Sequence, residues 1–277
     1  MFAILLHLLP AAAYTFLALH FWRVRGRVAA PLSATPRAPA SKLERIALLA
    51  ALLMQGAALQ SDLFSDGRMH FGFSTALSMM VWLALAVYWI ESLYARLEGL
   101  QALGLPLGAL CALLPLIFPA PVLAVNASSA AFRAHFIAAM LAYSLFTLAA
   151  LHALLMAAAE KRLHQGRLSR ALAALPPLLT MESLLFRLIL IAFLLLTATL
   201  GSGIFFSEAL FGKPLEFSHK TIFAFLSWLI FAVLLIGRHI WGWRGKKALR
   251  LTLSGFVTLL LAYVGSRFVV EVILGRG

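Results

Sequence analysis

The residues of this 277-residue chain that are best suited to chemistry are its eight histidines. Two of them, His135 and His219, each open a long apolar segment, H-F-I-A-A-M-L-A-Y-S-L-F and H-K-T-I-F-A-F-L-S-W. Two such helices packed side by side could hold two neutral imidazoles at one level, which is the arrangement that ligates a haem iron from both sides. Arg133, Lys220 and Arg267 lie near the same face and could neutralise the haem propionates.

A structural interpretation of the same residues stays open. His135 and His219 could be interfacial residues whose polar tips lie in the lipid headgroup layer. Arg267 could pair with Glu271, which lies one helical turn further along the same segment, instead of contacting a propionate.

The other histidines have simpler interpretations. His7 and His20 lie inside an apolar segment, where a polar side chain usually hydrogen-bonds across helices or faces a polar cavity. His164 and His239 follow apolar segments in basic loops, where we expect them to be solvated. His70 is expected at the same face as His135.

The elements that position these residues are predicted to be membrane helices. The chain is 63% apolar and 12% charged, whereas soluble domains are about 45–50% apolar and roughly 25% charged. We expect an all-α, polytopic transmembrane bundle of about eight spans, in one integral membrane domain over residues 1–277. The predicted spans are 2–22, 43–60, 71–90, 100–118, 131–158, 184–206, 221–241 and 251–274.

Charge placement predicts the orientation of these spans. Of the 23 Lys and Arg residues, 17 fall in the loops that lie inside if the amino terminus is outside, and 6 fall on the other side. The positive-inside rule therefore puts both termini on the periplasmic side of a bacterial inner membrane. Arg23, Arg25 and Arg27 follow the first span, the reverse of a signal peptide, so we expect that span to be retained.

Composition also excludes several classes. The net charge of +13 lies in short loops between apolar runs, so we expect membrane lipid and no nucleic acid as a partner. The single cysteine, Cys111, lies in an apolar run, and no C-x-x-C-H motif is present, so any haem would be a non-covalently bound haem b. No H-E-x-x-H, P-loop, dinucleotide or serine-nucleophile motif occurs. A small-molecule permease and an accessory subunit of another membrane complex remain alternatives.

The carboxy-terminal half carries more specific patterns. Two apolar runs, 222–236 and 251–264, flank a short basic loop, which predicts a membrane hairpin. The runs W-L-I-F-A-V-L-L-I-G-R, G-W-R-G-K-K-A, S-G-F and A-Y-V-G resemble the cytochrome c assembly family of membrane proteins. This family includes the haem-handling CcsA-type cytochrome c synthases and smaller HemX- and YpjD-like proteins. The resemblance covers roughly residues 131–268.

The resemblance implies a haem site at the outer face. In the large synthases, an external histidine followed eight residues later by Tyr-Ser or Tyr-Ala is an axial haem ligand, and His135 with Tyr143 and Ser144 is similar to that pattern. Glu208 and Thr221 can be laid against the ends of the synthases' Trp-rich haem-binding segment, but the tryptophans are absent here. The synthases' second external histidine has no match, so His219 as the second ligand follows from its position alone.

With these departures, the chain resembles the YpjD- and HemX-like branch of the family, which lacks the Trp-rich segment. The resemblance implies an inner-membrane protein that binds or handles haem at the periplasmic face during cytochrome c biogenesis, with other assembly proteins as partners. It implies an assembly factor rather than a complete synthase, and leaves enzymatic activity open.

Overall fold

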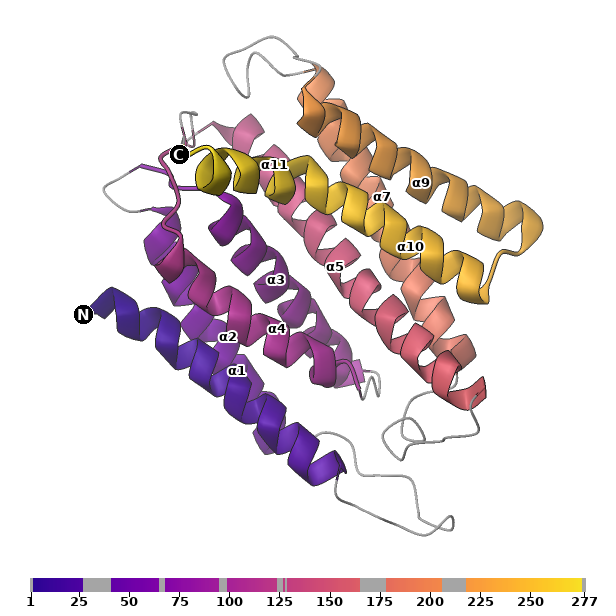
Figure 1. The fold of residues 1–277 in the computed structure, drawn as a ribbon, viewed down its shortest axis with the longest axis horizontal. Coiled ribbons are helices and arrows are strands. Elements are labelled where there is room, and N and C mark those ends of the chain that lie inside the picture. Colours follow the sequence, from indigo (N-terminus) through magenta and orange to yellow (C-terminus); the bar gives the residue numbers. More distant parts are fainter. Residues whose placement is uncertain are drawn as a thin grey trace.

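The computed structural model describes residues 2–26, 41–64, 68–94, 99–123, 127, 129–164, 178–205 and 218–275. Over these residues the chain is a bundle of α-helices, as predicted (Figure 1). The helices are α1 (Phe2–Gly26), α2 (Lys42–Leu63), α3 (Phe73–Tyr94), α4 (Gln101–Ile117), α5 (Ala130–His164), α7 (Leu178–Phe205), α9 (His219–Trp241) and α10 (Gly245–Leu260). The last continues as the π-helical turn η2 (Leu261–Gly265), α11 (Ser266–Phe268) and the π-helical turn η3 (Val269–Ile273).

Every predicted span corresponds to a helix of the bundle. Within the described ranges, seven helical stretches are long and apolar enough to cross a membrane, the last of them running from Gly245 to Ile273. The predicted fourth span is the apolar helix α4, which is shorter at 17 residues. Both ends of the chain lie toward the same end of the bundle (Figure 1). Glu208, the predicted start of the family's haem-binding segment, and the side chain of His164 lie outside the described residues.

Local sequence explains where α2 begins. Ser41 and Glu44 form a capping box, in which the Ser41 hydroxyl accepts the Glu44 N–H at 3.1 Å and the Glu44 carboxylate accepts the Ser41 N–H at 2.9 Å. This satisfies two of the amide groups that a helix start leaves without intrahelical partners. The pattern S-K-L-E before an apolar run is sufficient to predict that boundary.

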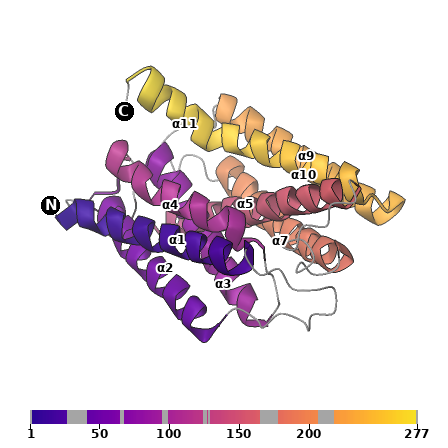
Figure 2. The same ribbon diagram turned by 60° about the horizontal axis from the view of Figure 1, so that its bottom comes forward.

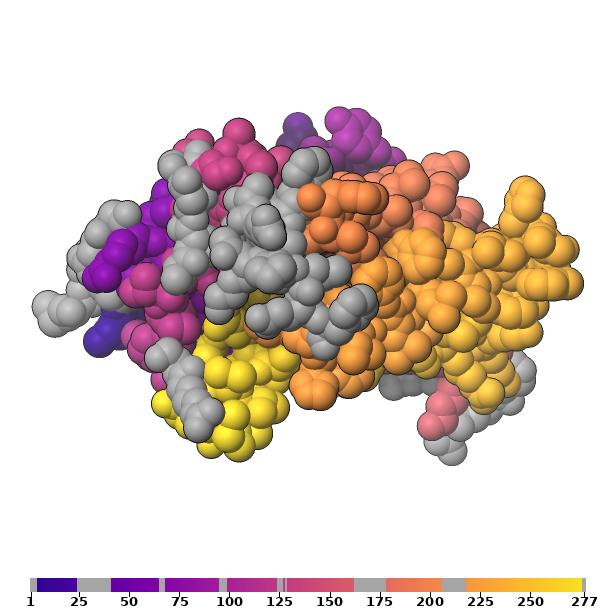
Figure 3. All heavy atoms as spheres, turned by 90° about the horizontal axis from the view of Figure 1, so that it is seen from above, coloured from indigo at the N-terminus to yellow at the C-terminus, as the bar shows by residue number. Residues whose placement is uncertain are grey.

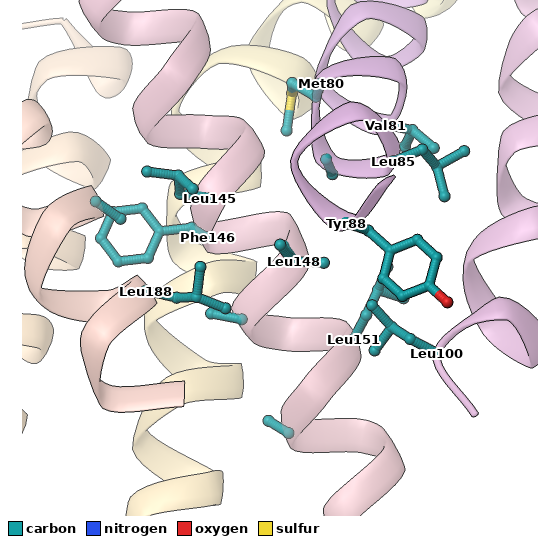
Figure 4. Close-up of a cluster of buried hydrophobic side chains, with 14 of the residues drawn as sticks. Met80, Val81, Leu85, Tyr88, Leu100, Leu145, Phe146, Leu148, Leu151 and Leu188 are labelled. Carbon is teal, nitrogen blue, oxygen red and sulfur yellow. The ribbon is translucent and has the colours of Figure 1, made fainter. Parts of the chain in front are cut away.

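Helix α5 is the centre of the bundle. Its apolar side chains pack on α3 at one side and on α7 at the other, with Tyr88, Phe146 and Leu188 in one continuous cluster (Figure 4). The ring of Phe146 stacks on Phe231 of α9 with a centroid separation of 3.9 Å. Alanines such as Ala142 on α5 are fully buried, because small side chains let membrane helices approach closely.

The two histidines of α1 hydrogen-bond or pair across helices, as predicted. His7 is buried, with Nδ1 2.9 Å from the Ala112 carbonyl oxygen of α4 and Nε2 3.3 Å from an Asp62 carboxylate oxygen of α2. His20 Nε2 lies 3.3 Å from a Glu44 carboxylate oxygen. These contacts give both rings structural partners in the amino-terminal half of the bundle.

The predicted hairpin is confirmed. Helices α9 and α10 run antiparallel beside α5 (Figure 2) and are joined by residues 242–244. Gly242 has φ +62° and Gly245 has φ +55°, a left-handed conformation that glycine adopts without steric strain. Trp243 folds back onto Gly237, where a Cβ atom would collide with the indole ring. Two glycines and one close approach therefore fix this tight connection.

Glu271 ties the carboxy-terminal helix to the start of α3. Its Oε2 atom accepts the Phe73 N–H at 3.0 Å, so the carboxylate lies at a helix N-terminus, which favours negative charge. A Cβ atom at Gly72 would lie 2.5 Å from the same oxygen. Glycine at this position therefore allows η3 and α3 to meet.

Candidate functional site

A cavity of about 440 Å³ lies where the starts of α5 and α9 meet the end of α7 and the turn η2. Figure 3 views the molecule from above in the frame of Figure 1 and shows α9 beside the carboxy-terminal helix. The volume falls within the roughly 300–1,000 Å³ of small-molecule sites. Apolar and aromatic residues form most of the wall: Phe71, Leu123, Phe132, Phe136, Ala139, Met140, Leu200, Gly203, Ile204, Ala224, Phe225 and Ala262. The polar lining residues are His135, Tyr143, Thr199, Ser218, Lys220, Thr221, Tyr263 and Arg267.

His135 is held on this wall by α7. It lies in the second turn of α5, and its Nδ1 atom is 2.8 Å from the hydroxyl oxygen of Ser202. Ser202 donates its own hydroxyl proton to the Thr199 carbonyl at 3.0 Å, so its oxygen is left to accept from Nδ1–H. We infer the tautomer with the proton on Nδ1, which puts the metal-binding lone pair on Nε2.

Two cations share the cavity with His135. Lys220 lies in the first turn of α9, and Arg267 lies in α11. The predicted pairing of Arg267 with Glu271 is present, with Nη1 3.8 Å from Oε1. The Nε atom of Arg267 is buried and has no hydrogen-bond partner among the residues described here. Arg267 therefore retains donor capacity beside the cavity in addition to its ion pair.

The other two predicted site residues lie outside the cavity wall. Arg133 is exposed on α5, and its Nε–H donates to the Ala127 carbonyl at 3.1 Å. His219 is the exposed first residue of α9, next to Lys220, and is not among the lining residues. The structure thus brings His135, Lys220 and Arg267 together and places Arg133 and His219 beside the cavity.

The structure adds aromatic and hydroxyl residues that the sequence did not single out for this site. Tyr263 lies in the π-helical turn η2, a local distortion that is frequent at functional sites. Phe71 packs against Phe136 with a centroid separation of 4.9 Å and against Tyr263 with one of 5.6 Å. In the sequence, Ser202 reads as one of several small residues that allow close helix contact. Only the packing of α7 on α5 brings Ser202 to His135.

Comparison with known proteins places these features in a family context. The chain matches the family described as "Cytochrome C assembly protein" over residues 39–274. It is 34% identical over 134 residues to the "Inner membrane protein YpjD" of Escherichia coli K12, covering 48% of this chain and 50% of that protein. No solved structure gives a significant match.

Two further relatives extend the comparison. An "Uncharacterized 28.8 kDa protein in nifR3-like 5'region" of Azospirillum brasilense is 31% identical over 214 residues, or 76% of this chain and 79% of that protein. The "Cytochrome c biogenesis protein CcsA" of Prochlorococcus marinus strain MIT 9301 is 38% identical over 88 residues, or 32% of this chain and 28% of that protein. The alignments with the YpjD proteins thus span half of those relatives.

Proposed function

Because this chain belongs to the cytochrome c assembly protein family, we propose that it binds haem beside His135 during cytochrome c biogenesis. It is a multi-pass inner-membrane protein, and we treat residues 1–277 as one membrane domain. One observation carries the proposal: the His135 imidazole, Lys220 and Arg267 line one largely apolar cavity of about 440 Å³.

The residues present fit the chemistry of haem. Haem is a flat, largely apolar ring with two carboxylates, and it supplies an iron that takes axial nitrogen ligands. The aromatic residues Phe71, Phe136 and Tyr263 offer ring faces and edges and exclude water. Arg267 keeps a buried donor without a partner among the described residues, and a propionate would satisfy it.

Each polar residue then has a specific task. His135 would bind the iron through Nε2, while the Ser202 hydroxyl oxygen, 2.8 Å from Nδ1, would fix the ring plane. A hydrogen bond of this kind to the second nitrogen orients a metal-bound histidine and raises its basicity. Lys220 and Arg267 neutralise propionates from two different helices.

A second ligand for the haem iron is a separate part of the proposal. His219 is the candidate that the sequence offers, one residue before the cavity-lining Lys220. Its exposed position at the start of α9 makes it the weaker of the two, so the haem proposal depends on His135. Arg133 remains a candidate propionate contact at the rim.

We propose that the cavity faces the periplasm and that both termini lie on that side. The support is the distribution of Lys and Arg, of which 17 of 23 lie in predicted inner loops. The cavity is formed by the starts of α5 and α9, opposite the basic hairpin loop at 242–244. Haem handling at this face would serve cytochrome assembly, together with partner proteins of the same process.

The deciding experiment is an absorption spectrum of the detergent-purified protein from haem-replete cells. We expect a Soret band and the split reduced bands of a low-spin haem, and acid–acetone should extract all of the haem because it is bound without a covalent link. A colourless protein would reject the haem site and favour a permease or an accessory subunit instead.

A further inference from the structure

A second cavity, of about 450 Å³, lies between the end of α5 and the start of α10. It is at the end of the bundle that carries the basic hairpin loop, opposite the first cavity. Its lining residues are Ala157, Glu160, Lys161, Lys246, Leu249, Arg250 and Leu253.

Helical spacing gives this cavity a charged mouth and an apolar floor. On α10, Lys246, Leu249, Arg250 and Leu253 follow the spacing i, i+3, i+4 and i+7, which places them on one helix face. On that face Lys246 and Arg250 are exposed, Leu249 is buried and Leu253 is half-buried. Ala157 of α5 adds to the apolar part. The groove is therefore complementary to a phospholipid, which has a charged headgroup and apolar acyl chains.

The charges at the mouth are mostly uncompensated. Lys246 Nζ lies 3.7 Å from a Glu160 carboxylate oxygen, which offsets one positive charge. In the part of the chain that the structure describes, neither Lys161 nor Arg250 makes an ion pair. The groove therefore presents to an anion two cations that have no ion pair with a described residue.

Two tryptophans near the start of α10 indicate how deep in the membrane the mouth of the cavity lies. Trp241 and Trp243 stack with a centroid separation of 5.5 Å, and Lys247 Nζ lies 3.4 Å from the centroid of Trp243. Tryptophans gather at the membrane–water interface, level with the headgroups. The mouth of the groove, at the first turn of α10, is thus at headgroup level, with Leu253 deeper.

We propose that this second cavity binds an anionic phospholipid. Its phosphate lies between Lys161 and Arg250, and an acyl chain follows Leu249 and Leu253 along the groove between α5 and α10. Basic pockets between membrane helices recognise anionic headgroups in this way. The proposal does not depend on haem binding, because none of these residues lines the first cavity.

The test is native mass spectrometry of the full-length protein in detergent, titrated with phosphatidylglycerol and, separately, phosphatidylcholine. We expect one saturable phosphatidylglycerol molecule per protein. The double change Lys161→Gln with Arg250→Gln should weaken its binding roughly 30-fold, because each basic residue near the surface contributes about 1 kcal/mol. The control pair Arg23→Gln with Arg187→Gln removes the same charge from exposed sites outside the cavity and should change binding less than about twofold.

If the double variant does not fold, a second variant that removes a negative charge, instead of positive ones, still tests the proposal. Glu160→Gln removes the only carboxylate among the described residues of the lining and should tighten phosphatidylglycerol binding severalfold. Equal losses in the cavity and control pairs, or no tightening in Glu160→Gln, would overturn the proposal. Displacement of the lipid by millimolar inorganic phosphate would also overturn it and assign the cations to a soluble anion.

Discussion

The Nδ1 atom of His135 on α5 lies 2.8 Å from the hydroxyl oxygen of Ser202 on α7, and Ser202 donates in turn to the Thr199 carbonyl. Together these bonds connect two helices that are far apart in sequence and select one tautomer of the ring. They make Ser202 a positioning residue for any ligand that His135 binds.

Ser202→Ala should therefore weaken haem binding by about tenfold without abolishing it, since losing such an outer hydrogen bond typically costs 10–100-fold in metal affinity. The measurement is haem titration followed at the Soret band, together with the reduction potential. Ser202→Thr should retain most of the affinity. Ser183→Ala is the matched control, because Ser183 makes the same kind of bond on α7, to the Thr180 carbonyl at 2.8 Å. Equal effects of Ser183→Ala and Ser202→Ala would contradict the positioning role.

His135→Ala should remove the low-spin spectrum, and added imidazole should restore it by filling the vacant ligand position. If His219 is the second ligand, His219→Ala should do the same, and the double change should be no worse than either single change, because both serve one site. His239→Ala, an exposed residue at the other end of α9, is the control.

A different result would identify the second ligand. If His135→Ala loses the spectrum and His219→Ala keeps it, the next candidate is His70. Its Nε2 atom is buried and lacks a hydrogen-bond partner within the described ranges. If neither change matters, haem does not bind at this cavity.

The two cations that line the cavity should matter more than Arg133, which lies outside its wall. Lys220→Gln and Arg267→Gln should each weaken haem binding by roughly tenfold, because a hydrogen bond to a charged group contributes about 1.5–3 kcal/mol. Arg133→Gln should change it by less than about threefold, since exposed pairs contribute about 0–1 kcal/mol. Haem titration of the three variants compares them directly. A larger loss in Arg133→Gln than in the other two variants would show that the rim, rather than the cavity wall, holds the propionates.

Most of the bundle could be predicted from hydrophobic runs. A bilayer requires about 20 apolar residues per helix, and each predicted span corresponds to a helix in the structure. The exception in length is α4, which the sequence presents as the run 100–118 and which forms a 17-residue helix. Boundaries with a local cause, such as the capping box of Ser41 and Glu44, could be predicted as well.

The site could be predicted only in part, because its wall combines several helices. Arg133 and His135 are two residues apart on α5, so they point about 200° apart around a helix of 3.6 residues per turn. Only His135 lines the cavity. His219 and Lys220 are adjacent on α9, so they also point in different directions, and of these two only Lys220 lines the cavity. Ser202 and Tyr263 could not be found, because the register of α7 and η2 against α5 is a tertiary property.

Orientation in the membrane is tested with reporter fusions. A phosphatase that is active only outside the cytoplasm should be active when fused after Gly277 and silent when fused after Lys247. The reason is that basic residues remain on the cytoplasmic side, where 17 of the 23 are predicted to lie. A fluorescent protein that folds only in the cytoplasm should give the complementary pattern. Activity after Lys247 with silence after Gly277 would reverse the orientation and move the His135 cavity to the cytoplasmic side.

Glu182 on α7 should hold the α9–α10 hairpin in place. Glu182 is only 7% exposed, and its Oε1 atom accepts from Arg238 Nη1 at 2.6 Å and from Arg244 Nε at 2.8 Å. Glu182→Gln should lower the free energy of unfolding by roughly 2–3 kcal/mol, near the value of one or two charge-assisted hydrogen bonds, because both arginines can still reach solvent. Glu160→Gln, whose pair with Lys246 is longer at 3.7 Å, should lower it by less than about 1 kcal/mol. Denaturant unfolding in detergent measures both variants, and equal destabilisation would show that the hairpin is held by apolar packing alone.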